Sequence, residues 1–110
     1  MKAINRIKKS EDFAFVIRNG SAKRNGSFVV HTKQNELGYA RIGISVSSKL
    51  GHAVTRNRIK RQMRAMVFEL VNLQQDSYDI VIVAKDGFLD RTYDENKALL
   101  AQLLTLQVGL

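Results

Sequence analysis

The chain has 110 residues, 45 % of them apolar, with a formal net charge of +8 and a pI near 10.1. This length and apolar content fit a single domain over residues 1–110, and the lack of cysteine excludes a disulfide framework or a thiolate metal site. So much positive charge on a small protein indicates a polyanionic partner, either nucleic acid or an acidic membrane surface.

The first predicted element is a helix over 11–19, "EDFAFVIRN", whose apolar residues recur at helical spacing. Ser10 is expected to cap its start and Gly20 to end it in the left-handed conformation. A loop over 20–27 then leads to a β-branched, aromatic strand at 28–33, "FVVHTK".

The next predicted strand, "YARIGISVSS" over 39–48, alternates strictly between two faces. Its apolar face consists of Ile42, Ile44 and Val46. Its other face is small and polar, with a basic residue at one end, and consists of Arg41, Gly43, Ser45 and Ser47. We expect this second face to stay open and to receive an extended ligand.

The rest of the chain predicts a helix, a strand and another helix. The first of these helices is expected to end near Asn72, and the strand "YDIVIVA" over 78–84 is apolar on both faces and therefore central. A last helix over roughly 93–106, capped by Asp90 or Thr92, would cover the apolar face of the sheet. The predicted order is α-β-β-α-β-α.

The segment "VTRNRIKRQMRAM" over 54–66 combines a core-facing stripe with a dense array of cations. The stripe, about 100° wide on a helix, consists of Ile59, Met63, Met66, Val67 and Leu70. The cations have no carboxylate between them and are Arg56, Arg58, Lys60, Arg61 and Arg64. Cations in the first half of a helix are unfavourable by ~0.3–1 kcal/mol each at low salt. An arrangement that opposes folding indicates that an anion occupies the site.

The positive charge is concentrated in one part of the chain. Residues 1–64 carry 15 Lys and Arg against three acids, a net of +12, whereas residues 65–110 carry three cations against seven acids, a net of −4. Guanidinium groups suit phosphate, so we favour a phosphate-backbone site over a merely solvated helix. A membrane surface is disfavoured because the apolar stripe lacks large aromatic anchors and is needed for the core. Charge alone leaves DNA and RNA open.

The segment "IGISVSSKLGHAVTRNRIKRQMR", with Arg56-Asn57-Arg58 near its end, resembles the core motif of the bacterial ribonuclease P protein subunit. The opening "RIKKSEDF" is similar to the start of that family, and the resemblance runs in order from residue 6 to about 84. It implies an α/β (α+β) two-layer sandwich with a central mixed sheet and a left-handed βαβ crossover. It also implies a subunit that assembles with a catalytic RNA, whose Mg²⁺ ions support removal of the 5′ leader from precursor tRNA.

The resemblance further implies two binding surfaces. The surface for the catalytic RNA would comprise Lys49, Arg56, Asn57, Arg58, Lys60, Arg61 and Arg64. The cleft for the single-stranded leader would comprise Phe13, Val16, Ile17, His31, Arg41, Ser45 and Ser47. Ile17 and His31 stand where the family often has phenylalanine and tyrosine, and Ser48 replaces a common lysine. Base stacking is worth ~1–3 kcal/mol, so leader contact is expected to be weaker or rearranged here. For Phe13 and Ile17, plain core packing is an equal alternative.

No catalytic residue or metal ligand is predicted in the protein itself. His31 and His52 do not stand at a pairing spacing, and the basic half has only Glu11, Asp12 and Glu36 as carboxylates, too few to hold two metals. The main alternative is a non-enzymatic RNA-binding module of the ribosome-associated or RNA-chaperone type. It explains the charge and the open strand face equally well, but not the ordered motif match.

The expected location follows from the segments that the sequence lacks. The first residues contain no signal-peptide core, and no run approaches the ~20 apolar residues of a membrane span. A cytoplasmic protein is therefore expected. The family resemblance implies the catalytic RNA and the precursor tRNA leader as its partners. The sequence predicts neither membrane binding nor an obligate protein partner.

Overall fold

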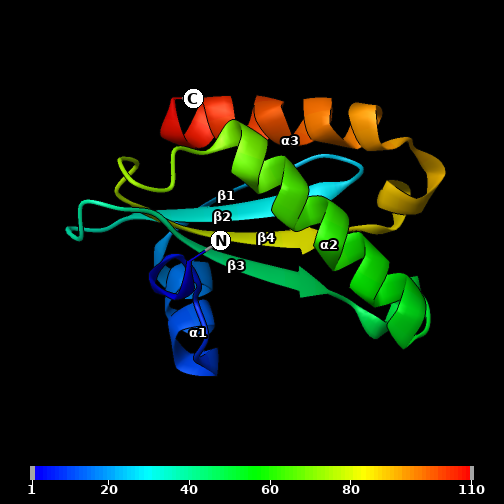
Figure 1. Ribbon diagram of the computed structural model, residues 1–110, viewed down its shortest axis with the longest axis horizontal. Coiled ribbons are helices and arrows are strands. Elements are labelled where there is room, and N and C mark those ends of the chain that lie inside the picture. Colours follow the sequence, from blue (N-terminus) through cyan, green and yellow to red (C-terminus); the bar gives the residue numbers. More distant parts are fainter. Residues whose placement is uncertain (1, 110) are drawn as a thin grey trace.

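The structure is a computed structural model that describes residues 2–109. It contains three α-helices, four strands and three short 3₁₀ turns (Figure 1). In chain order these are η1 Ala3–Asn5, α1 Ser10–Asn19, β1 Ser21–Arg24, β2 Phe28–Gln34, β3 Arg41–Val46, η2 Ser48–Leu50, α2 Ala53–Leu70, β4 Tyr78–Ala84, η3 Asp86–Asp90 and α3 Tyr93–Val108.

The four strands form one mixed sheet in the order β1-β2-β4-β3. Strand β4 runs antiparallel to β2 and parallel to β3, so it is central, as its apolar faces predict. The parallel pair is joined through α2, which lies in front of the sheet in Figure 1 while both strands point right and β4 lies above β3. This is a left-handed crossover, the rare hand for such connections.

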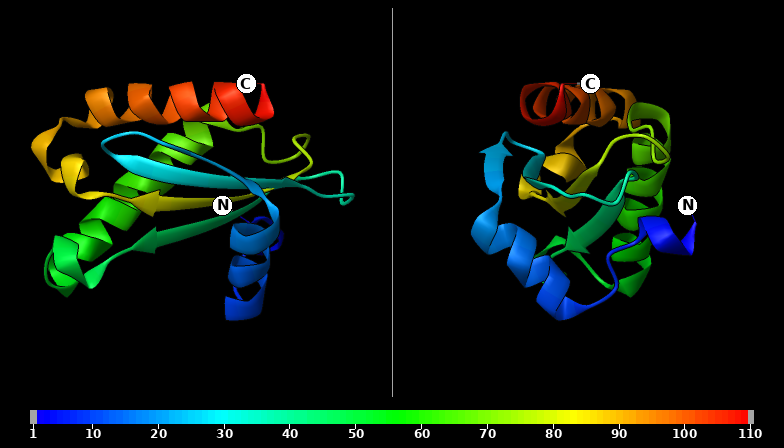
Figure 2. Two further views of the ribbon diagram at one scale, coloured as in Figure 1. Left: turned by 180° about the vertical axis from the view of Figure 1, so that it is seen from behind. Right: turned by 90° about the vertical axis from the view of Figure 1, so that its left-hand side faces the viewer.

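The main core lies between the sheet and the pair α2 and α3, which cover the same face (Figures 1 and 2). From α2 it takes four residues of the predicted stripe, Ile59, Met63, Met66 and Val67, each at most 1 % exposed. Leu70 is only partly buried at the edge of the core. The predicted stripe is therefore confirmed, and it fixes which side of α2 faces solvent.

Helix α3 begins at a complete capping box. Thr92 Oγ1 accepts a hydrogen bond from Glu95 N at 3.2 Å, and Glu95 Oε1 accepts one from Thr92 N at 2.9 Å. The pairing satisfies two backbone N–H groups that no helical turn could satisfy. Of the two predicted caps, Thr92 is the one used, and Asp90 lies in the preceding turn.

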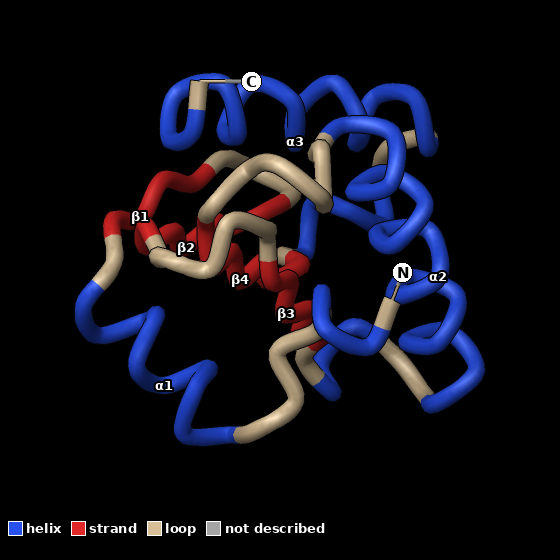
Figure 3. The backbone as a smooth tube through the Cα atoms, turned by 60° about the vertical axis from the view of Figure 1, so that its left-hand side comes forward, coloured by secondary structure: helices blue, strands red, loops and turns tan. Residues whose placement is uncertain are grey.

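Helix α1 packs alone on the opposite face of the sheet (Figure 3). Its small core joins Ile7 and Val16 to Val81 of β4, with Phe13 and Val83 packed at the margin. Phe13 lies directly over Gly43 of β3, where an added Cβ would come within 2.7 Å of its ring. The missing side chain at Gly43 therefore makes the hollow that the ring fills.

Three local predictions at the start of the chain are wrong. Ser10 lies inside α1, and Lys9 at the cap position makes no side-chain cap hydrogen bond. Gly20 has an ordinary φ of −91°. Its lack of a side chain matters for another reason, because a Cβ would lie 2.3 Å from Thr32 O on β2. The predicted loop 20–27 also contains strand β1, whose four residues are all exposed and which is held by backbone pairing to β2.

Within the described residues, no helix has the length and apolar character needed to cross a membrane.

The contact between Phe13 and Gly43 can be tested by stability. We expect Gly43→Ala to lower the free energy of unfolding by ~1–3 kcal/mol, because the new methyl overlaps the ring and forces α1 outward. Urea denaturation would measure this, with Ser45→Ala on the same strand face as the control. Adding Phe13→Leu to Gly43→Ala should recover part of the loss, and a fully stable Gly43→Ala would contradict the packing described.

Candidate nucleic-acid interface

The first candidate surface is the solvent-facing side of α2. Its buried stripe leaves the predicted cations outside, at graded depths. Arg58, Arg61 and Arg64 are exposed together with Asn57, whereas Arg56 and Lys60 are half-buried. The cations therefore project from a helix whose orientation the core has already fixed.

No carboxylate among residues 2–109 forms an ion pair with this array. The ion pairs of the described residues join Arg41 to Asp12 and Asp79, and Lys97 to Glu69, and none of them reaches the cations of α2. The first turn of α2 contains no acid, and His52 at the cap position makes no side-chain hydrogen bond to it. The positive end of the helix dipole therefore adds to the potential of the cations.

Two further features extend this surface. Exposed Lys49 leads into α2 from the turn η2, where Ser47 Oγ accepts a hydrogen bond from Lys49 N at 3.2 Å. At the other end, Phe68 is 72 % exposed. The sequence prediction missed Phe68, although its spacing of four from Arg64 and seven from Arg61 places it on the same helix face.

The second candidate surface is the sheet face on the α1 side, and it is less open than predicted. Gly43 is buried beneath Phe13, and Arg41 is held by Asp79. Arg41 Nη2 lies 2.6 Å from Asp79 Oδ2 and Arg41 Nε lies 2.9 Å from Asp79 Oδ1, and this hydrogen-bonded pairing raises the pKa of the Arg41 guanidinium. The expectation that the whole Arg41–Ser47 face stays uncovered is therefore wrong at its Arg41 end, because the hollow at Gly43 draws α1 onto it.

The accessible part of that face lies beyond α1, at the ends of β3 and β4. Figure 2 (left) shows α1 over one end of the sheet, with the arrowheads of these strands extending past it. Half-buried Ser45 pairs in register with half-buried Val83, and exposed Ser47 follows β3. The part of this face that stays accessible beside α1, which we call the candidate leader groove, is therefore shorter than the predicted cleft.

Helix α1 presents only some of its predicted cleft residues to this groove. Val16 is completely buried, so it supports the helix and cannot contact a ligand. Asp12 lies 4.0 Å from Arg41, and Lys33 lies over the ring of Phe15, which places that shoulder of α1 toward the closed end. Ile17, 45 % exposed, lies on the opposite shoulder by helical geometry and faces the open end together with the half-buried Phe13.

His31 occupies the middle of the same face, in register with Val81. Its Nδ1 atom is buried without a hydrogen-bond partner. Burial lowers the pKa of His31 from its ordinary value of 6.5, and the nearby charge of Arg24 lowers it further. The imidazole is therefore neutral at pH 7 and offers a flat ring rather than a charge.

Comparison with known proteins identifies the family of this chain. A family model described as Ribonuclease P matches residues 1–106. The chain belongs to the ribonuclease P protein family. It is 43 % identical over 105 residues to the ribonuclease P protein component of Mesoplasma florum, covering 94 % of this chain and 96 % of the relative.

Solved ribonuclease P proteins share the fold. The Staphylococcus aureus RNase P protein aligns with a TM-score of 0.87 at 37 % identity, covering 99 % of this chain and 100 % of that one. A Staphylococcus aureus mutant described as having defective mRNA degradation activity aligns at 0.84 and 35 %, covering 94 % of this chain and 87 % of that one. The mixed-sheet α+β fold that the motif implied is thus confirmed.

The described residues of this chain offer no ready metal site. Among residues 2–109, no three His, Cys, Asp or Glu side chains lie together as a group that could hold a metal ion. Asp12 and Asp79 on the α1 side of the sheet are both engaged by Arg41.

The lowered pKa of His31 makes a prediction about pH. Between the folded pKa and 6.5 the unfolded chain binds more protons than the folded one, so stability should fall as the pH drops through this window. We expect His31→Gln to lose less stability than the wild type between pH 7.5 and 5.5, measured by urea denaturation. His52→Gln, at an exposed position, is the matched control. Parallel pH profiles for the wild type and His31→Gln would show that His31 is not the group responsible.

Proposed function

We propose that this chain is the ribonuclease P subunit that binds the catalytic RNA through α2 and the single-stranded 5′ leader of precursor tRNA through the groove beside α1. In this role it supports Mg²⁺-dependent endonucleolytic removal of the leader, which yields the mature 5′ end of the tRNA. The observation that carries the proposal is the cation array on α2, which no acid of the described residues neutralises. Membership of the family supplies the RNA partner.

The energetics of α2 support a polyanionic partner. Arg56, Lys60 and Arg64 repel one another at i, i+4 spacing, and repulsion from the helix dipole adds ~0.3–1 kcal/mol for each cation near the N-terminus at low salt. RNA phosphates convert these unfavourable terms into attraction and release counterions. Because the buried stripe has fixed the helix, binding restricts little conformational freedom beyond that of the cationic side chains themselves.

The groove beside α1 suits an extended single strand. The ring of Phe13 and the neutral imidazole of His31 provide flat surfaces for unstacked bases. Ser45 and Ser47 provide hydroxyl groups that bond to phosphate or sugar oxygens. With Ile17 in place of an aromatic residue, we propose that leader binding here depends less on stacking and more on backbone contacts.

We propose that the catalytic RNA holds the Mg²⁺ ions and carries out the chemistry in the cytoplasm. The described residues of the protein do not fit a metal site, and we assign no step to a metal bound by the protein. The mutant Staphylococcus aureus relative is described by its defective mRNA degradation, which makes cleavage by protein alone the second candidate. In this chain, His31 and His52 belong to different surfaces, which favours the supporting role.

The division of labour can be tested with a 5′-labelled precursor tRNA at low, near-physiological Mg²⁺. Three reactions are compared: the host catalytic RNA alone, the protein alone, and both together. We expect efficient cleavage at the mature 5′ end only in the mixture. Cleavage by the protein alone would support the second candidate, and an unstimulated mixture would leave an RNA-binding module outside ribonuclease P.

The role of the α2 array can be tested by salt dependence. About five phosphate contacts should give a log–log slope of binding against salt near −3.5 to −4.5, and Arg61→Ala should reduce its magnitude by about 0.7–0.9. Arg61 is exposed, so we expect the variant to keep the stability of the wild type in urea. Arg18→Ala, at an exposed position of α1, is the control. A slope near zero for the wild type would contradict phosphate binding by α2.

A further inference from the structure

A pocket of about 260 Å³ crosses the free edge of β3 and lies between the two proposed RNA surfaces. Its walls come from the N-terminal segment, α1, β3 and α2, and they include Arg6, Lys8, Phe13, Ile42, Ile44 and Arg64. Three of these side chains are cations and none is an acid. The pocket therefore differs from an ordinary apolar groove.

Arg6 is held at this edge by a fixed backbone. Ile7 N donates to Ile42 O at 2.9 Å, in an isolated parallel bridge between the segment and β3. On the other side of Arg6, the buried Asn5 side chain donates to Ala40 O at 2.7 Å and to Leu73 O at 2.9 Å. These contacts fix the position of the Arg6 backbone at the edge of β3.

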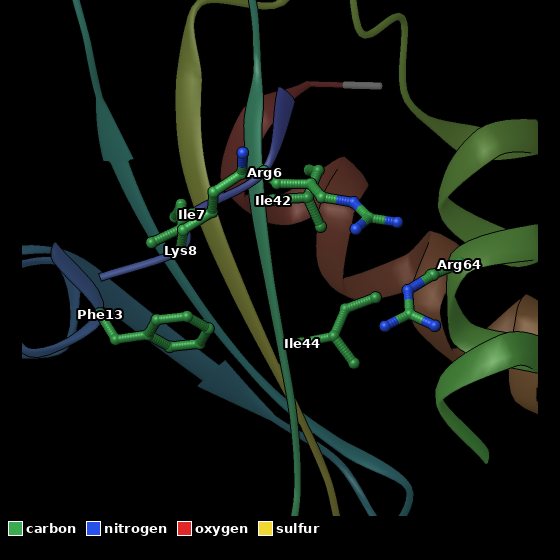
Figure 4. Close-up of a pocket in the computed structure, with 7 residues that line it drawn as sticks. All are labelled: Arg6, Ile7, Lys8, Phe13, Ile42, Ile44 and Arg64. Carbon is green, nitrogen blue, oxygen red and sulfur yellow. The ribbon is translucent and has the colours of Figure 1, made fainter. Parts of the chain in front are cut away.

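Arg6 and Arg64 converge on the same side of β3. In Figure 4, Arg6 extends across the strand toward α2, and Arg64 extends from α2 back toward the strand. Both guanidinium groups lie beside Ile42 and Ile44, while Lys8 and Phe13 lie on the far side of the strand. No carboxylate among residues 2–109 forms an ion pair with Arg6, Lys8 or Arg64. Like charges that approach without a counter-charge repel each other in the free protein.

The strand edge between them adds a backbone donor. Alternate residues of a strand direct their N–H and C=O groups to the same side. Because Ile42 O accepts from Ile7 on the outer edge, Ile44 directs its N–H outward as well. Within the described part of the chain, β3 is an edge strand and its bridge to the N-terminal segment is confined to Ile42.

We propose that this pocket binds one phosphodiester of an RNA strand that crosses the edge of β3. Two guanidinium forks and the Ile44 N–H would share its oxygens, which is the donor geometry that phosphate favours. The proposal rests on the proposed function and adds to it a contact that connects the α2 surface with the α1 groove. The phosphate could belong to the catalytic RNA or to the precursor leader, and both present the same chemistry.

The test is a double-mutant cycle with Arg6→Gln, Arg64→Gln and the double variant, and Arg18→Gln serves as the control. Two affinities are measured: protein for the catalytic RNA alone, and holoenzyme for precursor tRNA with a long or a one-nucleotide leader. We expect each single change to weaken one of these affinities about tenfold. Because one phosphate is shared, the double variant should bind little worse than either single variant. Its salt slope should lose about one phosphate contact, not two.

The arms separate the possible sources of the phosphate. A loss in binding of the catalytic RNA alone places the phosphate in that RNA, whereas a loss confined to the long-leader substrate places it in the leader. Arg6→Lys and Arg64→Lys keep the charge without the fork, so they should retain the salt slope but not the full affinity. Urea denaturation of every variant confirms that it is folded.

Two outcomes would overturn the proposal. Losses that multiply in the double variant, with two contacts missing from the salt slope, would mean two independent sites. No loss from Arg6→Gln, while Arg61→Ala still weakens RNA binding, would remove the pocket but leave the proposed function intact. If Arg61→Ala also has no effect, the proposed function itself fails.

Discussion

The burial of one stripe of α2 against the sheet is the constraint on which the rest of the structure depends. Ile59, Met63, Met66 and Val67 are almost completely removed from solvent, so the helix cannot rotate without exposing its apolar side. Arg61 and Arg64, which lie between these residues in the sequence, must then face outward, and Lys60 lies half-buried at the margin. The cationic side of α2, which is electrostatically unfavourable in isolation, is thereby fixed in place by apolar packing on the opposite side of the helix.

The strand order places the parallel strand β3 at the edge of the sheet, and the crossover from β3 to β4 through α2 is left-handed. The apolar stripe of α2 packs over one face of the sheet, with the cations of α2 turned to solvent, and α1 partly covers the other face. The glycine at position 43 lets α1 approach closely, and the same approach shortens the open groove. The order of the strands and the missing side chain at Gly43 thus determine which part of this sheet face stays accessible.

The features that sequence could predict are those set by local periodicity and composition. The stripe of α2, the central position of β4 and the cap at Thr92 all follow from spacing or residue type. Strand β1 could not be foreseen, because its polar residues carry no alternation and only backbone pairing with β2 orders them. The hydrogen-bonded pair of Arg41 and Asp79 joins residues 38 positions apart, so no local sequence pattern predicts it. Family resemblance supplied the hand of the crossover and the division of residues between two surfaces.

Asn5 has a consequence for the order of folding. Its side chain joins the carbonyl groups of Ala40 and Leu73, which lie 35 and 68 residues further along the chain. Contacts between residues so far apart form slowly because closing the intervening loop costs entropy. They also cannot form before the later partner has been synthesised. The N-terminal segment, although made first, therefore docks late. A ribosome-bound chain that has not yet released Leu73 lacks one of the two anchors that hold this segment at β3.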